Sequence, residues 1–252
     1  MDWSDDGIVL SSRPHGETGA IVELLTRAHG RHLGLVRGGR SRRHRPILQQ
    51  GNVVKARWRA RLSEHLGAFE VELTDARAAL VLDDPAALAG VGTLCALARL
   101  LPERDPHRTL HDAAHVILDH LDEAGLWPGL LVRWELGLLE ELGFGLDLSA
   151  CAKTGGREGL IYVSPKSGRA VSREAGAPYA GKLLALPAFL GREGAAGFGL
   201  EDVLAGFALT GHFLEMHVLR PRGLEMPEPR ERLIGRLARR GWAEGGAAGA
   251  GA

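Results

Sequence analysis

The chain has 252 residues, 45% of them hydrophobic and 25% charged, and its 31 basic residues balance its 31 acidic ones. This length is at the upper edge of what one hydrophobic core serves, so two subdomains are expected. No window approaches eighteen uninterrupted apolar residues, and the acidic start M-D-W-S-D-D-G has neither region of a signal peptide. These features predict a cytoplasmic protein with no membrane span. Two cysteines do not make a disulfide framework. Cys95 is expected to be a small residue of the protein core, carried by a helix.

The balanced total hides a local excess of positive charge. Residues 27–61 contain eleven basic residues and no acidic one, so the rest of the chain carries 20 basic against 31 acidic residues. Such an asymmetry indicates a polyanionic partner. The densest part is V-R-G-G-R-S-R-R-H-R-P, residues 36–46, with five arginines in nine residues. They are Arg37, Arg40, Arg42, Arg43 and Arg45.

The first eighty residues have the short strands and frequent turns that are typical of a small β domain. Five short runs rich in β-branched or alternating residues are separated by glycine-containing turns, which predicts a five-stranded barrel. The fourth run alternates strictly: Trp58 and its apolar neighbours point inward. The same alternation places four cations on the outer face. They are Lys55, Arg57, Arg59 and Arg61.

The fifth run offers these cations an alternative to a ligand. It has the complementary pattern, with Glu70 and Glu72 outward. A hairpin between the two runs is predicted to set Arg61 opposite Glu70 and Arg59 opposite Glu72, as cross-strand ion pairs. That register would leave Lys55, Arg57 and the arginine-rich stretch without a carboxylate partner.

Beyond residue 80 the pattern becomes helical. Asp84-Pro85, Thr109 and Pro128 each begin an amphipathic segment, and two more helices follow after residues 199 and 227. Leu130, Trp134, Leu138 and Leu142 recur four residues apart and predict a buried stripe. The expected fold is α+β: a barrel over residues 1–80, a helical domain over 81–240 with a hairpin at about 151–180, and a disordered tail over 241–252.

Motifs for bond-breaking chemistry are incomplete. In G-A-P-Y-A-G-K-L the residue after Lys182 is leucine, where a phosphate-binding loop needs a hydroxyl for Mg²⁺. In H-D-A-A-H, His111 and His115 share a helix face, but aspartate replaces the glutamate base, so a solvated helix face is the simpler interpretation. A metal- or nucleotide-dependent enzyme stays open as an alternative that would depend on these residues. We predict no catalytic residues and no cofactor.

Cys151 marks a site with missing ligands. A zinc knuckle of two C-x-x-C pairs around the hairpin would use positions 151, 154, 171 and 174, where this chain has Cys151, Thr154, Val171 and Glu174. One thiolate and one carboxylate do not make a tetrahedral zinc site. We therefore predict no metal and a hairpin held by packing.

Several stretches together resemble the RecO recombination mediators. G-I-V-L-S-S-R, E-T-G-A-I-V-E-L-L-T, H-G-R-H-L-G-L-V-R-G-G-R and L-Q-Q-G-N-V-V-K-A-R-W are similar to the barrel of that family. R-W-E-L-G-L-L-E-E-L-G-F-G, L-S-A-C and Y-V-S-P-K-S-G resemble its central helix and knuckle, and H-V-L-R-P-R-G-L-E-M-P-E-P-R-E-R-L its C-terminal helix. The main departure is the knuckle, where family members with four cysteines bind zinc.

This resemblance implies an oligonucleotide-binding (OB) fold followed by a helical domain. It implies a non-enzymatic role in DNA repair and recombination, in the cytoplasm and associated with the nucleoid. The partners implied are single- and double-stranded DNA, RecR, and the acidic C-terminal tail of the single-stranded-DNA-binding protein. The protein would anneal complementary strands and help to load RecA. Arg133 is our candidate for binding the acidic tail.

The residues themselves suggest how DNA would be held. The basic segment has only one aromatic side chain that could stack on bases, Trp58, and its parity points it inward. We therefore expect phosphate electrostatics to dominate, through the five arginines of residues 36–46 and the four cations of the fourth run. The alternative is an adaptor whose basic barrel binds an acidic protein partner instead of DNA.

Overall fold

The computed structural model describes residues 1–62, 64–191 and 197–240. The chain forms two compact units, which we call the barrel unit, residues 1–122, and the helical unit, from residue 123 onward. Among the described residues, no helix is long and apolar enough to cross a membrane. The tail predicted to be disordered, residues 241–252, lies outside the described part, and the predicted domain boundary at residue 80 stays a prediction.

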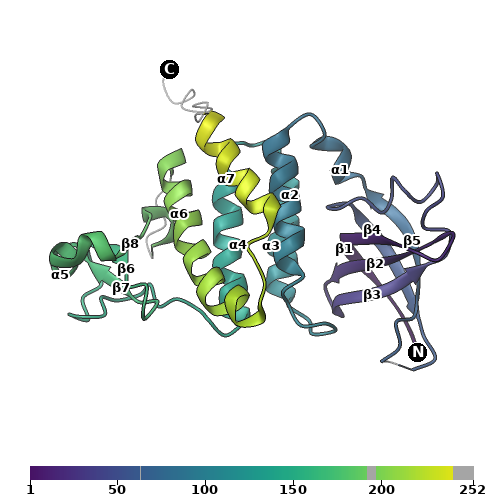
Figure 1. Cartoon of the computed structure of the whole chain (residues 1–252), viewed down its shortest axis with the longest axis horizontal. Helices are drawn as coiled ribbons and strands as arrows, with labels where there is room; N and C mark the ends of the chain where they lie inside the picture. Colours follow the sequence, from purple (N-terminus) through teal and green to yellow (C-terminus); the bar gives the residue numbers. More distant parts are fainter. Residues whose placement is uncertain (63, 192–196, 241–252) are drawn as a thin grey trace, which may run out of the picture. The chain divides into compact units, whose positions relative to one another are not determined.

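Five strands close into a barrel in the order β1-β2-β3-β5-β4 (Figure 1). All neighbouring strands are antiparallel except β3 and β5, and β4 pairs back onto β1. This closed five-stranded arrangement is the OB-fold that the sequence predicts. The strands are β1 (Asp2–His15), β2 (Gly19–Thr26), β3 (Gly30–Val36), β4 (Val53–Arg59) and β5 (Ala68–Asp75).

Alternate residues of the strands fill the barrel interior, as their period of two requires. Val22, Val54, Trp58 and Phe69 belong to its core, and each is at most 3% exposed. Gly34 on β3 faces the Phe69 ring, and a Cβ at this position would lie 2.4 Å from a ring carbon. The ring occupies the space that the missing side chain leaves, so the barrel core depends on this glycine.

Helices cover part of the outer surface of the barrel. After α1 (Arg77–Leu80), α2 (Pro85–Ala98) begins at Asp84, whose side chain accepts hydrogen bonds from the amides of Ala86 and Ala87. Cys95 on α2 is fully buried, and its Sγ lies 3.6 Å from the carbonyl oxygen of Val9. This confirms the predicted core position. α3 (Arg108–Asp119) completes the unit.

The helical unit is built on three longer helices, α4 (Trp127–Glu141), α6 (Leu200–Phe213) and α7 (Glu228–Arg240). The predicted stripe on α4 is confirmed at its centre, where Trp134 and Leu138 are buried, whereas Leu130 and Leu142 at its ends are half-buried. α6 continues as a π-helical turn, η3 (Leu214–Leu219), before the 3₁₀ turn η4 (Arg220–Arg222).

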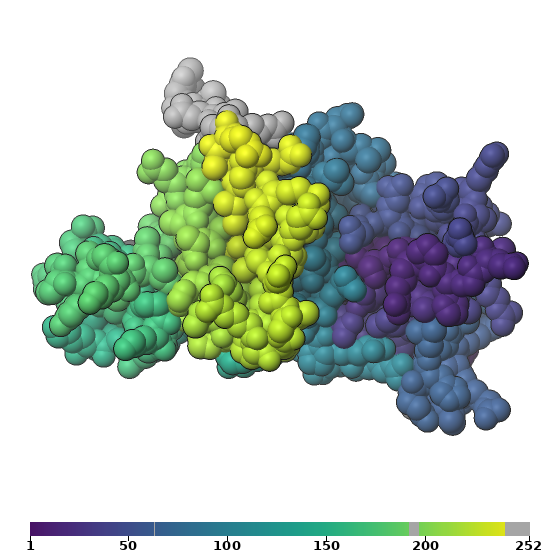
Figure 2. Space-filling view, viewed as in Figure 1, coloured from purple at the N-terminus to yellow at the C-terminus, as the bar shows by residue number. Residues whose placement is uncertain are grey.

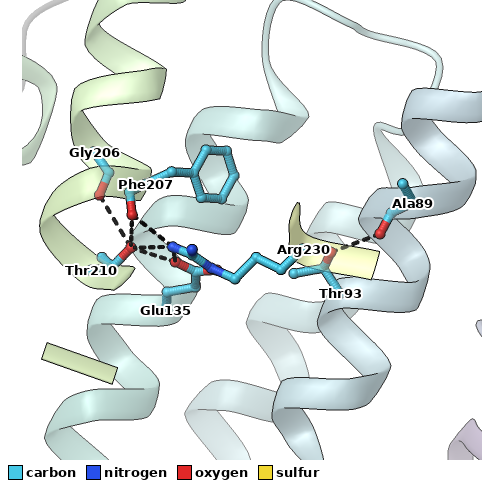
Figure 3. A network of polar contacts seen from close by, with 7 residues as sticks. All are labelled: Ala89, Thr93, Glu135, Gly206, Phe207, Thr210 and Arg230. Atoms are coloured by element: carbon cyan, nitrogen blue, oxygen red, sulfur yellow. Dashed lines mark hydrogen bonds and ion pairs between the residues drawn. The ribbon is translucent and has the colours of Figure 1, made fainter. Parts of the chain in front are cut away.

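A buried ion pair connects these three helices (Figure 3). Arg230 on α7 donates from Nε and Nη2 to the two carboxylate oxygens of Glu135 on α4, at 2.8 and 2.9 Å. Nη2 also donates to the carbonyl of Phe207 and to the hydroxyl of Thr210 on α6, and that hydroxyl donates to Glu135. Two charges withdrawn from water are tolerated because each has several hydrogen-bond partners.

A small sheet interrupts the helical unit. Strands β6 (Leu160–Val163), β7 (Ala170–Ser172) and β8 (Leu184–Ala185), with α5 (Arg173–Gly176) and the 3₁₀ helix η1 (Ala177–Lys182), form what we call the hairpin subdomain, residues 151–185. The predicted hairpin is present as β6–β7. Figure 2 shows the subdomain as a lobe beside α6.

Candidate nucleic-acid interface

The β3–β4 loop, residues 37–52, carries the five arginines of the densest basic stretch. Arg37, Arg40, Arg42, Arg43 and Arg45 are all exposed. Apart from Arg40, none of their side chains forms a hydrogen bond or ion pair with any residue in the described part of the chain. Their charges are therefore available to an anion from solvent.

This loop is ordered by its own backbone. The amides of Arg45 and Leu48 donate to carbonyls four residues earlier, at 3.1 and 3.0 Å, as in a helical turn. Leu48 is 5% exposed and belongs to the barrel core, and the Asn52 side chain donates to the carbonyls of Pro46 and Ile47. Cations held on an anchored loop lose less conformational entropy on binding than cations on a loose one.

Arg40 connects the loop to the β1–β2 hairpin. Its Nη1 donates to the carbonyl oxygens of Glu17 at 2.8 Å and Gly16 at 3.2 Å, and its amide donates to that of Thr18 at 3.0 Å. Carbonyls leave the guanidinium charge uncompensated. The same hairpin carries Arg13, which is exposed on β1. Sequence reasoning missed Arg13 because it lies outside the basic stretch in sequence.

The outer face of β4 differs from this loop. Arg57 and Lys55 lie opposite Glu70 and Glu72 on β5, and opposite Ser4 and Asp6 on the other side, β1. Acidic residues therefore flank this strand on both sides. We call Lys55, Arg57, Arg59 and Arg61 the β4 stripe.

Two ion pairs are formed in the β4 stripe. Arg57 Nη2 lies 3.0 Å from Asp2 Oδ2, and Arg59 Nη1 lies 3.8 Å from Glu70 Oε1. The hydrogen bond from Arg57, together with its charge, lowers the pKa of Asp2. These exposed pairs add little stability, but each carboxylate cancels charge that a phosphate would otherwise meet.

The predicted pairing between β4 and β5 was wrong in register. Glu70 lies opposite Arg57 rather than Arg61, and Glu72 opposite Lys55 rather than Arg59. β4 ends at Arg59, so Arg61 lies beyond the strand. Lys55 and Arg57, which the sequence left without carboxylate neighbours, are flanked on β5, and Arg57 is also paired with Asp2 of β1.

Part of the outer face of β2 and β3 is closed to ligands. OB-folds commonly bind oligonucleotides across these two strands. Here Glu23 on β2 is only 3% exposed. It forms ion pairs with Arg31 and Arg99 and accepts a hydrogen bond from the Ser11 hydroxyl. Leu25, its neighbour on the same face, is 1% exposed. The segment after α2 thus covers this half of the face, which leaves the loop end of the barrel as the accessible basic surface.

Aromatic side chains lie inside the barrel rather than on its basic surface. Trp58 is 2% exposed and its Nε1 donates to the carbonyl of Leu66, as its inward parity predicted. His32 lies edge-on to Trp58, and neither of its ring nitrogens has a hydrogen-bond partner in the described part of the protein. Burial, with the nearby charges of Arg104 and His29, lowers the pKa of His32 to about 4. This imidazole is neutral at physiological pH.

Arg133 on α4 borders a pocket of about 500 Å³ in the helical unit. Its Nη2 donates to the carbonyl of Phe189 at 2.6 Å, and its guanidinium lies 5.9 Å from the centre of the Phe189 ring. Leucines form most of the rest of the lining, and Glu140 adds one acidic group. A pocket with an apolar wall and one arginine can take an apolar group that carries a carboxylate.

The residues of the alternative motifs have other partners. Asp112 makes hydrogen bonds of 2.9 to 3.2 Å with Arg27, and Asp119 is paired with Arg77. No cluster of three or more metal-ligating side chains is present among the residues described. Lys182 ends a 3₁₀ helix, and Gly176 packs against the Tyr162 ring, so the glycine-rich stretch does not form a phosphate-binding loop.

The knuckle is closed by packing, as predicted. Cys151 is 1% exposed in a cluster with Val171 and Ala175, and its Sγ accepts a hydrogen bond from the amide of Ser172 at 3.3 Å. Of the other positions considered as ligands, Thr154 and Val171 lie beside the thiol, whereas Glu174 is exposed. Burial raises the pKa of Cys151, but hydrogen bonds from Thr154 and Ser172 outweigh it and hold the pKa at about 6.

Comparisons with known proteins cover both units. Residues 1–77 match the family model "Recombination protein O N terminal" and residues 82–224 match "Recombination protein O C terminal". The chain is 54% identical over 239 residues to the DNA repair protein RecO of Methylorubrum populi, covering 93% of this chain and 97% of that protein. It is 55% identical over 237 residues to RecO of Mesorhizobium japonicum, covering 94% of each. The chain therefore belongs to the RecO family of recombination and DNA repair proteins.

Proposed function

We propose that this protein binds single- and double-stranded DNA through the β3–β4 loop, and that it acts in DNA repair by annealing strands rather than by cutting or joining them. The observation that carries the proposal is the set of exposed loop arginines without carboxylate partners among the described residues. Exposed Arg13, on the hairpin that Arg40 contacts, adds a sixth cation. Phosphate is the ligand that such a set favours, and guanidinium groups contact it in bidentate fashion.

The mode of binding follows from what surrounds these cations. Without an aromatic platform on the basic surface, bases are not gripped and sequence is not read. A surface that holds backbones and leaves bases free allows complementary strands to meet, which annealing requires. If about six cations contact phosphate, log affinity falls against log salt with a slope of roughly −4 to −5.

We extend the proposal to protein partners, which would bind at a second site in the helical unit. The pocket beside Arg133 suits the acidic C-terminal tail of the single-stranded-DNA-binding protein, because the arginine can meet a carboxylate while leucines and Phe189 surround an apolar side chain. Docking there would bring the protein to coated single strands. With RecR, it would then help RecA to replace the coat.

An annealing assay tests the main proposal. Complementary oligonucleotides, bare or coated with single-stranded-DNA-binding protein, are mixed with the full chain and duplex formation is followed by fluorescence. We expect acceleration in both cases. Arg133→Ala should remove the acceleration only for coated strands, because the barrel would be unaffected. No acceleration of bare strands by wild-type protein would contradict the proposal.

The adaptor alternative predicts a different outcome in a competition experiment with oligonucleotides. If the loop binds an acidic protein partner and not DNA, an excess of bare oligonucleotide would not displace that partner. Competition by oligonucleotides supports the DNA proposal, whereas partner binding that oligonucleotides leave unchanged supports the adaptor.

A further inference from the structure

A second excess of positive charge lies in the hairpin subdomain. Residues 151–182 contain six basic and two acidic residues, whereas the rest of the chain from residue 123 onward contains nine basic and thirteen acidic. This basic patch is therefore local to one small sheet in an otherwise acidic unit. It lies outside the barrel unit that carries the β3–β4 loop.

Backbone hydrogen bonds of the knuckle hold the segments that carry three of these cations close together. Lys153 lies in the turn that the hydrogen bond between the Cys151 amide and the Gly156 carbonyl closes, and Arg157 follows this turn directly. The amide of Arg173 donates to the carbonyl of Gly159 at 2.8 Å, which places the start of α5 beside the same turn. Lys153, Arg157 and Arg173 are exposed and form no ion pair with any described residue.

A fourth cation is accompanied by an exposed aromatic ring. In a 3₁₀ helix, side chains three residues apart are eclipsed, so Tyr179 and Lys182 lie on one face of η1. The Tyr179 side chain is 55% exposed. An exposed ring beside a cation is the arrangement on which single-strand binders stack a base while holding its phosphate. The β3–β4 loop offers no such ring.

We propose that the hairpin subdomain is a second binding surface for single-stranded DNA, through Lys153, Arg157, Arg173 and Lys182 with Tyr179 stacking on a base. This inference rests on the proposed function, because it supplies the second of the two strands that annealing brings together. The Tyr179 ring distinguishes the two surfaces. Because a base that stacks on the ring must be unpaired, the hairpin subdomain should select single-stranded DNA, whereas the β3–β4 loop should hold single- or double-stranded DNA.

The test separates capture of a first strand from capture of a second. An oligonucleotide of about 16 nucleotides, the upper end of the site size of one OB-fold, is fixed to beads and saturated with the full chain. After washing, a labelled strand that is not complementary to the first is titrated. Wild-type protein should retain this second strand, and duplex of the same length should compete for it poorly.

The variants compare cations without an ion pair with cations that have one. The triple variant Lys153→Gln, Arg157→Gln, Arg173→Gln should lose at least tenfold in second-strand affinity while first-strand affinity stays within about threefold. The matched control is Arg169→Gln, Arg220→Gln, Arg232→Gln, which removes three exposed cations already paired with Asp147, Glu215 and Glu228. It should leave both affinities unchanged.

Tyr179 gives an independent readout without a change of charge. Tyr179→Ala should weaken second-strand binding by roughly five- to tenfold, as loss of one stacked base does, and Tyr179→Phe should restore it. Unchanged second-strand capture in the triple variant, or an equal loss in the control, would overturn the inference while leaving the proposed function intact. If wild-type protein binds no first strand, the proposed function fails and this inference fails with it.

Discussion

The β3–β4 loop and the β4 stripe are two groups of cations on one barrel with opposite surroundings. They are adjacent in sequence and have similar composition. The loop arginines face solvent with no carboxylate partner in the described part of the protein, while Asp2, Asp6, Glu70 and Glu72 flank the stripe. We therefore propose that the absence of carboxylate neighbours, and not the number of cations, makes the loop the surface that binds phosphate.

The largest expected effect comes from removing the charges of the β3–β4 loop. In the quadruple variant Arg37→Ala, Arg42→Ala, Arg43→Ala, Arg45→Ala, affinity for single strands should fall about 10²- to 10³-fold near 0.1 M salt, because four phosphate contacts and their counterion release are lost. Fluorescence anisotropy measures the affinity. The thermal midpoint should move little, since these side chains are exposed, and an affinity loss below tenfold would contradict the assignment.

The next largest effect is expected in the pH dependence of the stability of the barrel that carries both groups. The pKa of His32, lowered to about 4 by burial, lies below that of the unfolded chain, so the folded state binds fewer protons. The contribution of neutral His32 to the free energy of unfolding is therefore fully present above about pH 6.5. It falls by about 1–3 kcal/mol as the pH drops toward 4. Urea unfolding at pH 7 and pH 4.5 measures this loss. His32→Phe should reduce it, and an equal loss in both proteins would show that His32 is not its source.

Removing the carboxylates beside the β4 stripe should let the stripe bind DNA as well. In Asp2→Asn, Glu70→Gln, Glu72→Gln, three neighbouring carboxylates are removed, and affinity for DNA should rise about tenfold as the stripe gains two or three phosphate contacts. The control Glu201→Gln, Glu225→Gln, Glu231→Gln removes three exposed acidic groups from the helical unit. An equal gain in the control would attribute the effect to net charge and not to the stripe.

The smallest effect is expected from the β4 stripe itself. Lys55→Ala, Arg57→Ala, Arg59→Ala, Arg61→Ala removes as many positive charges as the loop variant, yet affinity should change less than about threefold, because flanking carboxylates already cancel most of that charge. The same anisotropy measurement compares the two variants. A loss equal to that of the loop variant would contradict the proposed difference between the two groups of cations.

The prediction of the barrel from sequence succeeded where information is local. Alternation in the fourth run placed Trp58 inside and its cations outside, and the signals at Asp84 and Ser164 located a helix and a hairpin. The register between β4 and β5 was wrong by four residues, because the connection, residues 60–67, contains more residues than the turn signals suggested.

The candidate site was predictable only in part. The basic loop was visible as a charge run, but the acidic neighbours of β4 on β1 lie about fifty residues away in sequence and meet it only through barrel closure. Arg13 was missed because it lies outside the basic stretch in sequence. The ion pair of Glu135 and Arg230, 95 residues apart, carried no sequence signal, since each is an ordinary charged residue on its own helix.

The most direct test of the central claim is the salt dependence of DNA binding in the loop and stripe variants side by side. Plots of log affinity against log salt should give a slope of roughly −4 to −5 for wild-type protein and for the stripe variant, and a slope smaller in magnitude by about 3 for the loop variant. Equal slopes in the two variants, or a reduction confined to the stripe variant, would contradict the account.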